Sequence, residues 1–481
     1  MSTGTSEIPT AIDLTETAPV STAIEVIVKE LKRAQEAITG VRGPVRELAE
    51  SYERYLARQE AVKGRPPWYP YVGSGLGRGP LVQLADGSVK WDMISGIGVH
   101  MFGHGDPDLV ARALKAAISD TVMQGNLQFG TEVIEFAEFL LGEAGRSSRL
   151  AHCFLINSGA LANESALKVC LQHNSPASRV LAFAGGFAGR TTSLVQIGDS
   201  AAGREGLPLS VAVDYVPFYD PRRPEESTGE ALKRLRQLID RYPGGHACFI
   251  MELVQGEGGF NIAPREYFVA LMELCRDRSI AVWLDEIQTF GRTLKMFYFD
   301  QLKLGEYVDV VTLGKLSQVC ACLYTDEYRP QPGLLSATFV GSTVALAVGL
   351  RMLERLASGG YYGPAGRIAA LQAAFGTRMD ELVDRNPAWF SPRNDADGPA
   401  AGCFYDGVGG MMRFTPFAGD KTRVMGALRV KFDEGAIAFG CGRSPHHIRF
   451  LPPIGVMQPA DFDGVFEVVE AALEKAARRD P

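Results

Sequence analysis

Short apolar runs alternate with amphipathic stretches along the middle of the chain. The runs lie at residues 153–156, 180–183, 247–253, 280–284 and 308–313, and the segments between them have apolar residues at helical spacing. Strands that are apolar on both faces, each followed by a helix, indicate a mostly parallel sheet covered by helices. We therefore expect an α/β fold with a large sheet domain.

The flanking segments have other patterns. Residues 23–61 have apolar residues at helical spacing, and residues 66–79 are rich in turn formers. An Asp86-Gly87 turn predicts a hairpin between 81–84 and 89–93. Residues 344–382 predict one or two amphipathic helices, and the remainder predicts a smaller α+β unit. The predicted division is a flexible tail at 1–20, an N-terminal segment of a small domain at 21–94, a large domain at 95–345 and a C-terminal small domain at 346–481.

Composition narrows the class of ligand. Of the 481 residues, 46% are hydrophobic and 22% charged, and the net charge is -7, which disfavours nucleic acid and anionic membrane as partners. The eight cysteines lie mostly in apolar runs, as in a reducing cytosol, and no export signal or spanning segment is visible, so a cytoplasmic location is expected. The 53 glycines and 27 prolines indicate many tight turns, some of which would cradle a small ligand.

Two strands deliver chemically useful side chains at their carboxyl ends. The run at 282–284 ends in Asp285, and the run at 308–313 is followed by Gly314 and Lys315. An Asp in this position is also a common helix cap. If both strands belong to one parallel sheet, the carboxylate and the amine emerge at the same edge. Pyridoxal 5'-phosphate (PLP) enzymes need this pair: a lysine for the Schiff base and a carboxylate that keeps the pyridinium nitrogen protonated.

Two further turns have ligand-binding character. The sequence 157–168 reads as strand, small-residue turn and helix, so that backbone N–H groups and the positive helix end converge on one point suited to a phosphate. The Gly-rich turn at 184–191 contains Phe187 and, three residues later, Arg190. It is read either as a ring-stacking platform with a carboxylate-binding arginine or as a surface loop.

Several motifs in order make the chain resemble the class III aminotransferases, the fold-type I PLP enzymes that include 4-aminobutyrate, ornithine and lysine ε-aminotransferases. The resemblance runs from about residue 79 to the C-terminal helix. It is carried by the motifs at 91–107, 158–168, 252–259, 284–289 and 336–339, and the nearest branch is the 4-aminobutyrate and lysine ε-aminotransferase one. It implies a homodimeric transferase without a metal ion, with a large sheet domain and a small α+β domain built from N- and C-terminal segments.

The resemblance also implies a role for each matching residue. Lys315 would hold PLP as a Schiff base and shuttle protons, Asp285 would pair with the pyridinium nitrogen, and Gln288 would contact the ring hydroxyl. Phe187 would stack on the ring, while Ser158, Gly159 and Ala160 would bind the phosphate together with Thr338 of the neighbouring subunit. Arg190 would bind a substrate carboxylate, and Glu252 with Arg449 would act as a removable charge pair for two unlike substrates.

The implied reaction is ping-pong transfer of an amino group from an ω-amino acid or a diamine, including lysine-like donors, to 2-oxoglutarate. A PLP-dependent racemase, aminomutase or decarboxylase uses the same apparatus, and a non-catalytic homologue is a further alternative. The chain departs from the family pattern at Ala188, where a His is usual, at 316–320 after the lysine, and at 340–343.

Overall fold

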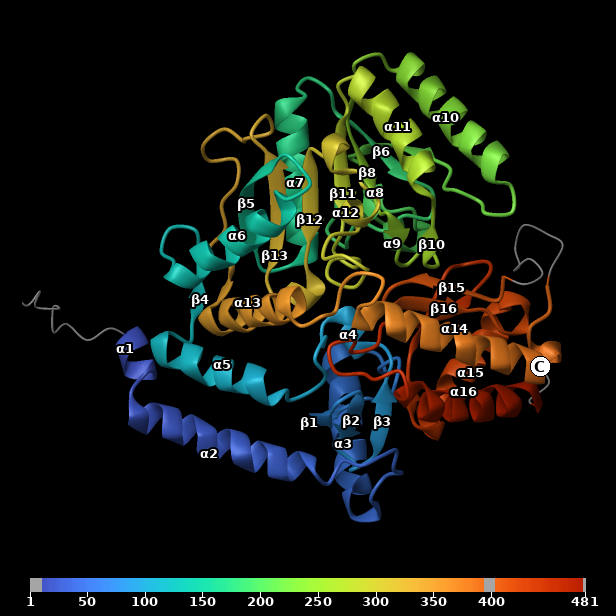
Figure 1. The fold of residues 1–481 in the computed structure, drawn as a ribbon. Helices are drawn as coiled ribbons and strands as arrows, with labels where there is room; N and C mark the ends of the chain where they lie inside the picture. Colours follow the sequence, from blue (N-terminus) through green and yellow to red (C-terminus); the bar gives the residue numbers. More distant parts are fainter. Residues whose placement is uncertain (1–10, 393–402, 479–481) are drawn as a thin grey trace, which may run out of the picture.

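The computed structural model describes residues 11–392 and 403–478, and its centre is a seven-stranded sheet (Figure 1). The strand order is β5-β13-β12-β11-β8-β6-β7, and every neighbouring pair is parallel except the two that involve β13. The strands are β5 (Leu150–Ile156), β6 (Arg179–Phe183), β7 (Ala212–Val216), β8 (His246–Met251), β11 (Ala281–Asp285), β12 (Val310–Leu313) and β13 (Cys320–Thr325). The predicted α/β class and mostly parallel sheet are confirmed.

Alternate residues of the strands enter two separate cores. Along β8, Cys248 and Ile250 pack into one cluster with helix α7 (Gly159–His173), while Phe249 and Met251 pack into the other with α11 (Arg265–Asp277). A strand with both faces covered must be apolar at every position, which explains the uninterrupted runs in the sequence.

The pairing of β11 with β12 places Asp285 and Lys315 at one edge of the sheet. Strand β11 pairs in parallel with β12, and Asp285 lies opposite Thr312. Lys315 follows Thr312 by three residues, so that the carboxylate and the amine leave the sheet at the same edge, as the sequence predicts.

The small domain joins distant parts of the chain. Strand β17 (Ala436–Ile437) pairs in parallel with β3 (Val89–Asp92), which forms the predicted hairpin with β2 (Leu81–Leu84). The other small-domain sheet is antiparallel, with the order β15-β16-β19-β18: β15 (Tyr405–Val408), β16 (Met411–Phe414), β19 (His447–Phe450) and β18 (Phe439–Cys441). N- and C-terminal segments therefore build one unit, as expected.

Two details of the N-terminal segment differ from the prediction. Within the stretch expected to be a flexible tail, α1 (Ala11–Thr15) and the start of α2 (Ala18–Gln35) are helical, whereas residues 1–10 lie outside the described part. The turn-rich stretch contains strand β1 (Gly73–Arg78), which pairs with β2. The Gln35 side chain bonds the carbonyls of Gly77 and Gly105, at 2.7 and 2.8 Å, and holds α2 against the body of the protein.

The remaining elements connect and cover the sheets. They are α3 (Ala49–Lys63), α4 (Ser95–Gly98), α5 (Pro107–Ser119), β4 (Met123–Gln124), α6 (Thr131–Ala144), α8 (Leu194–Ile197), α9 (Ala201–Arg204), α10 (Pro224–Arg241), β9 (Val254–Gln255), β10 (Asn261–Ile262), α12 (Tyr298–Gln301), β14 (Gly341–Ser342), α13 (Thr343–Ser358), α14 (Arg367–Arg385), α15 (Lys421–Glu434), α16 (Asp461–Arg478) and five 3-10 turns at 46–48, 305–307, 315–317, 387–389 and 417–419. The two helices expected within 344–382 are α13 and α14.

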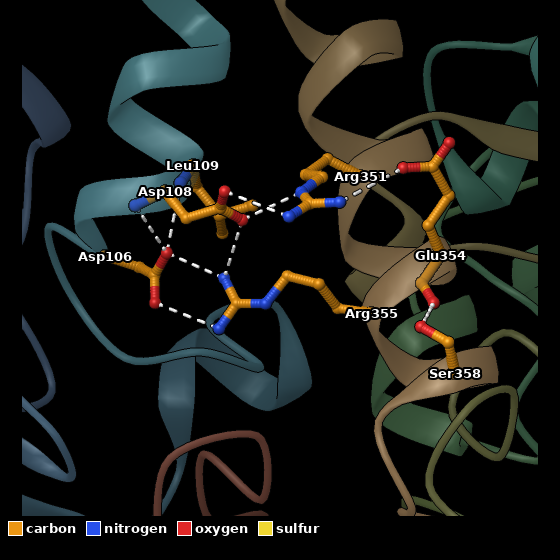
Figure 2. Close-up of polar contacts among 7 residues, drawn as sticks. All are labelled: Asp106, Asp108, Leu109, Arg351, Glu354, Arg355 and Ser358. Carbon is orange, nitrogen blue, oxygen red and sulfur yellow. Dashed lines mark hydrogen bonds and ion pairs between the residues drawn. The ribbon is translucent and has the colours of Figure 1, made fainter.

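An ion-pair cluster binds α5 to α13 (Figure 2). Asp106 caps α5 by accepting bonds from the backbone N–H groups of residues 108 and 109, and it also binds Arg355 of α13 at 2.7 Å. Arg351 binds Asp108 at 2.9 Å. The Arg355 guanidinium lies 3.7 Å above the Phe102 ring. The Asp106 carboxylate thus caps α5 and also binds α13, which holds the two helices together.

Among the described residues, no helix is long and apolar enough to cross a bilayer. The same residues contain no group of three or more His, Cys, Asp or Glu side chains suited to a metal ion. Cys320 and Cys322 are free thiols buried in β13.

Candidate active site

A cavity of about 550 Å³ opens at the carboxyl edge of the sheet, between the two domains. Nine of the eleven residues proposed from the sequence line it: Gly159, Ala160, Phe187, Arg190, Glu252, Asp285, Gln288, Lys315 and Arg449. The volume suits a cofactor with a small substrate. Ser158 and Thr338 lie outside this lining and are described below.

Lys315 stands on a constrained turn. Strand β12 ends at Leu313, and Lys315 begins a 3-10 turn with a left-handed φ of 55°. A non-glycine residue held in this region is strained, which is common at functional sites. Burial, followed by the nearby Arg449 cation, lowers the pKa of the amine. These two effects favour the neutral amine, which is the nucleophilic form.

Asp285 is held by two donors at the end of β11. Its Oδ1 accepts the backbone N–H of Ile287 at 3.0 Å, and its Oδ2 accepts the Asn163 amide at 2.7 Å. Burial raises the pKa of this carboxyl to about 6. Each oxygen of this buried carboxylate thus accepts one N–H group, and a cation in the cavity would stabilise its charge further.

Asn163 is a site residue that the sequence reasoning missed. Its amide donates both to Asp285 and to the backbone carbonyl of Ala188, each at 2.7 Å, and its own buried oxygen has no partner. Asn163 therefore links Asp285, at the end of β11, to the turn that contains Phe187. The available signal was its place one helical turn after Gly159, because residues at i and i+4 share a helix face.

The strand, turn and helix expected around residues 157–168 are present. Ser158 is the N-cap of α7, where its hydroxyl accepts the backbone N–H of Leu161, and Gly159 begins the helix. A side chain at Gly159 would bring its Cβ within 2.8 Å of Ile287, beside Asp285. The small residue therefore lets the helix end approach the strand that carries the carboxylate.

Glu252 organises the Phe187 turn. Its two oxygens accept the backbone N–H groups of Phe187, at 2.7 Å, and Gly256, at 3.0 Å. Loss of water around the carboxyl, together with the Asp285 charge, raises its pKa to about 8. The Arg190 guanidinium lies 5.8 Å from the centre of the Phe187 ring.

Arg449 pairs with a different glutamate from the one that the resemblance implies. The guanidinium of Arg449, whose side chain is 3% exposed, binds Glu257 at 2.8 Å. Glu257, five residues after Glu252, is 41% exposed and lies at the mouth of the cavity. The expected neighbour Glu252 lines the same cavity but is bonded to backbone. In this conformation the removable charge beside Arg449 is therefore Glu257.

A left-handed backbone segment forms another wall. Four consecutive residues, Ser95 to Gly98, have φ values of 45°, 66°, 61° and 85°. Asp92 accepts the backbone N–H of Ser95 at 2.7 Å, and the Ser95 hydroxyl bonds the Leu451 carbonyl at 2.6 Å. Gln318, in the unusual segment after the lysine, donates to the Val99 carbonyl at 3.3 Å. The Ser95 to Gly98 segment is thus linked, through Val99 and Gln318, to the turn that carries Lys315.

Thr338 lies on an exposed loop outside the cavity lining. Asn126 donates its backbone N–H and its side-chain amide to the carbonyl of Ala337, at 3.3 and 3.1 Å. The paired loops carry Leu127, Phe129 and Phe339, which are 92%, 51% and 51% exposed. Apolar side chains gathered on a surface in this way are typical of protein interfaces.

A lysine and a buried carboxylate on neighbouring parallel strands, with a helix N-terminus beside them, define a cofactor enzyme of the α/β class. The family model for class-III aminotransferases matches residues 72–388. The chain belongs to this family.

Known proteins support this assignment. The chain is 33% identical over 304 residues to an acetylornithine aminotransferase of Corynebacterium efficiens, covering 60% of this chain and 70% of the relative. It is 27% identical over 418 residues to one from Brucella melitensis, covering 84% and 93%. A lysine aminotransferase from M. tuberculosis superposes with a TM-score of 0.74 at 23% identity, covering 88% and 99%. An ornithine aminotransferase from Toxoplasma gondii gives 0.74 at 21%, covering 89% and 96%.

The protein is a PLP-dependent aminotransferase, and its residues fit the cofactor. The buried oxygen of Gln288 and the buried Nε of Arg449 have no partner and can serve a bound group. The helix end at Gly159 suits the phosphate, and the carboxylate of Asp285 suits a protonated ring nitrogen.

Proposed function

We propose that the enzyme transfers an amino group from an ω-amino acid or a diamine, lysine-like donors included, to 2-oxoglutarate by a ping-pong mechanism. The observation that carries this proposal is the presence of Lys315, Asp285, Arg190 and Arg449 in one cavity. The relatives named above, which transfer amino groups of acetylornithine, ornithine and lysine, agree with a donor whose reacting amine is remote from a carboxylate.

Lys315 is the proposed attachment point and proton carrier. Its depressed pKa favours the neutral amine, which could accept a proton from the reacting carbon of the substrate and later donate it again. When bound, PLP supplies an electron sink for the negative charge that develops on that carbon. Asp285, held by Asn163 and the backbone N–H of Ile287, would pair with the ring nitrogen, and Gln288 would contact the ring hydroxyl.

Arg190 and Arg449 are proposed to distinguish the amino donor from the dicarboxylate acceptor. Arg190 binds the carboxylate of the amino donor, while Arg449 stays covered by a glutamate. A dicarboxylate acceptor displaces that glutamate and binds both arginines. The resemblance assigns the covering role to Glu252, and the observed ion pair at 2.8 Å favours Glu257, with Glu252 holding the Phe187 turn. A removable countercharge allows one site to accept substrates of unlike charge.

The remaining proposed contacts concern the phosphate. The Ser158, Gly159 and Ala160 turn would bind it from within the chain, and Phe187 would stack on the ring. Thr338 would reach it from the neighbouring subunit of a homodimer. Support for the dimer comes from the exposed apolar side chains beside Thr338.

The test of the function is a donor assay on the PLP-loaded enzyme. Formation of glutamate from 2-oxoglutarate with N-acetylornithine, ornithine, lysine or 4-aminobutyrate supports transamination, and a visible absorbance band marks the bound cofactor. Lys315→Ala should remove the band and lower turnover by at least about 10³-fold. Donor consumption without glutamate would reject the proposed acceptor.

Mixing two variants tests the shared site. Lys315→Ala and Thr338→Ala are each impaired, but a mixed dimer has one site with both residues intact. Refolding the two together should restore activity above the level of either parent. A monomer in sedimentation, or no gain on mixing, would contradict a site completed by the neighbouring subunit.

A further inference from the structure

A second cavity, of about 320 Å³, lies apart from the Lys315 cavity and is here called the aromatic cavity. Helix α3, the loop that precedes β1 and strands β3, β17 and β18 contribute to its lining, and the segment 94–104 closes one side. No described residue lines both cavities. The volume is typical of a small-molecule site, and the reaction at Lys315 gives the aromatic cavity no role.

Three nearly parallel aromatic rings form one wall of the aromatic cavity. The ring planes of Trp68 and Phe439 differ by 9°, with ring centres 6.4 Å apart, and the Tyr69 ring is inclined to them by 28° and 19°. The buried Tyr69 is fixed by a 2.6 Å bond from its hydroxyl to the Ala438 carbonyl, whereas Trp68 is 42% exposed. A flat aromatic surface with one ring open to solvent favours a planar ring as the occupant.

The polar atoms of the lining favour an occupant with an N–H group. The buried Oε1 atom of Gln59 has no hydrogen-bond partner among the described residues. His100 stacks on His104, with ring centres 4.1 Å apart. Burial, followed by the neighbouring His104, lowers the pKa of His100, so that this ring is neutral at pH 7. A buried acceptor without a partner is costly, and an N–H group of a bound ligand would satisfy it.

The charge of the lining disfavours an anion. Among the described lining residues Asp92 is the one carboxylate, and none is a lysine or an arginine. Asp92 accepts the backbone N–H of Ser95 at 2.7 Å and lies 2.8 Å from Nε2 of His104. Arg429, outside the lining, lies 5.7 Å from the centre of the Trp68 ring. An anionic ligand would therefore face a buried carboxylate without a cation in the lining to offset it.

The left-handed backbone segment separates the two cavities. Ile94 and Gly96 line the aromatic cavity, and Ile97 lines the Lys315 cavity. Gly96 is exposed, with a φ of 66°. A molecule that packs against Gly96 would hold this strained segment in place, and with it the apolar wall of the Lys315 cavity.

We propose that the aromatic cavity binds a small planar aromatic molecule that has an N–H donor and no negative charge, of the indole type. The ring packs on Trp68 and Phe439, its N–H group donates to Oε1 of Gln59, and its binding stabilises the segment shared with the Lys315 cavity. This inference goes beyond the proposed function, because it depends on neither the amino donor nor the acceptor.

A titration of the PLP-loaded enzyme by ligand-observed NMR tests the site. Indole supplies both the ring and the N–H group, and its Kd should be on the order of 10⁻⁴ M, as expected for a ligand of this size. 1-Methylindole lacks the N–H group and should bind roughly fivefold more weakly. Indole-3-acetate carries a negative charge and should not displace indole.

Two variants assign the contacts. Trp68→Ala should weaken the binding of indole at least about tenfold, because it removes the open ring of the wall. Gln59→Leu keeps the size of the side chain and should weaken indole about fivefold while leaving 1-methylindole unchanged. The matched control is Gln331→Leu, at an exposed position in the loop after β13, and its affinity for indole should equal that of wild type.

Hydrogen exchange measures the effect on the shared segment. The backbone N–H groups of Gly98 and Val99 bond the carbonyls of Ile94 and Ser95 at 2.9 and 2.8 Å. Saturating indole should slow exchange in a peptide that covers residues 95–100 by about threefold or more in wild type, and not in Trp68→Ala.

Each contrary result has a distinct meaning. Absence of indole binding, or binding that Trp68→Ala and Gln59→Leu leave unchanged, would overturn the site. Displacement of indole by indole-3-acetate would reject the ligand class, and unchanged exchange at 95–100 in the saturated enzyme would reject the link to the Lys315 cavity. Because no measurement requires turnover, failure of the donor assay leaves these outcomes unaffected.

Discussion

The edge of the sheet that carries Lys315 and the mouth of the cavity that carries the arginines are built in different ways. Asp285 and Lys315 come from adjacent parallel strands, thirty residues apart in sequence, and their positions follow from one register. Arg190 follows β6 in the large domain, whereas Arg449 belongs to the small domain. The reacting groups therefore depend on one sheet, and substrate recognition depends on how two domains meet.

Burial separates the two regions as well. The amine and the acid lie deep in the cavity, where loss of water shifts the pKa of both groups. Arg190 is exposed, and the partner of Arg449 is 41% exposed. Substitution of a buried charged group has a large effect on free energy, because its partners are left buried and unpaired. Substitution of a partly exposed charge has a smaller effect, because water screens its interactions.

The largest expected effect tests the deep region. Asp285→Asn keeps the shape of the side chain but cannot hold a proton on the ring nitrogen, so kcat should fall by roughly 10²- to 10³-fold. Steady-state kinetics with the bound cofactor counted by mass spectrometry measures this. Asn163→Ala, which removes one donor to Asp285, should cost about 10- to 100-fold. A kcat for Asp285→Asn within tenfold of wild type would contradict the assignment.

A smaller effect is expected at the mouth of the cavity. Arg190→Gln should raise KM for carboxylate-bearing donors by about tenfold with little change in kcat, because it removes a charge-assisted hydrogen bond used in binding. Monoamine donors without a carboxylate are the control, and their KM should be the same in Arg190→Gln and wild type. Equal losses with both donor types would place Arg190 in the chemical step instead.

The stability of the whole fold, outside both regions, should depend on the α5–α13 cluster. Arg355→Ala removes the bonds to Asp106 and the contact with the Phe102 ring, and should lower the free energy of unfolding by about 1–2 kcal/mol. Arg351→Ala, whose side chain is 41% exposed, should cost about 0.5 kcal/mol. Denaturant unfolding measures both. Unchanged stability in Arg355→Ala would show that the cluster does not tie the segments together.

The smallest effect concerns pH. The pKa of Glu252 rises from 4.5 to about 8 on folding, so the folded state binds a proton that the unfolded chain releases. Its contribution to stability therefore falls as pH rises from about 4.5 to about 8. Glu252→Gln cannot lose a proton, and the fall of Tm with pH in cofactor-free protein should be shallower than in wild type. A parallel pH profile would contradict the raised pKa.

The sequence predicted the deep region better than the mouth. Asp285 and Lys315 could be read from apolar runs because a strand buried on both faces has a distinctive pattern and delivers its next residue to a known edge. The roles proposed for Gln288 and Thr338, in contrast, came from the resemblance alone. The helical start of α2 and the short strand β1 were missed because polar and glycine-rich segments take their conformation from tertiary packing.

Contacts between distant segments were the hardest to foresee. The choice between Glu252 and Glu257 beside Arg449 depends on how strand β19 lies against the 252–259 segment, which no local pattern encodes. Asn163 likewise gains its importance from two partners, 25 and 122 residues away in sequence. Such contacts depend on the assembled fold.

The left-handed run from Ser95 to Gly98 has a consequence for altering the enzyme. Ile97, a β-branched residue with a φ of 61°, lines the Lys315 cavity, and the start of its segment is anchored where Ser95 bonds Asp92 and the Leu451 carbonyl. A glycine there would remove both the strain and the apolar wall. A screen for heat resistance and a screen for broader donor range would therefore select the same residue at this position, so a more stable variant would also be a less selective one.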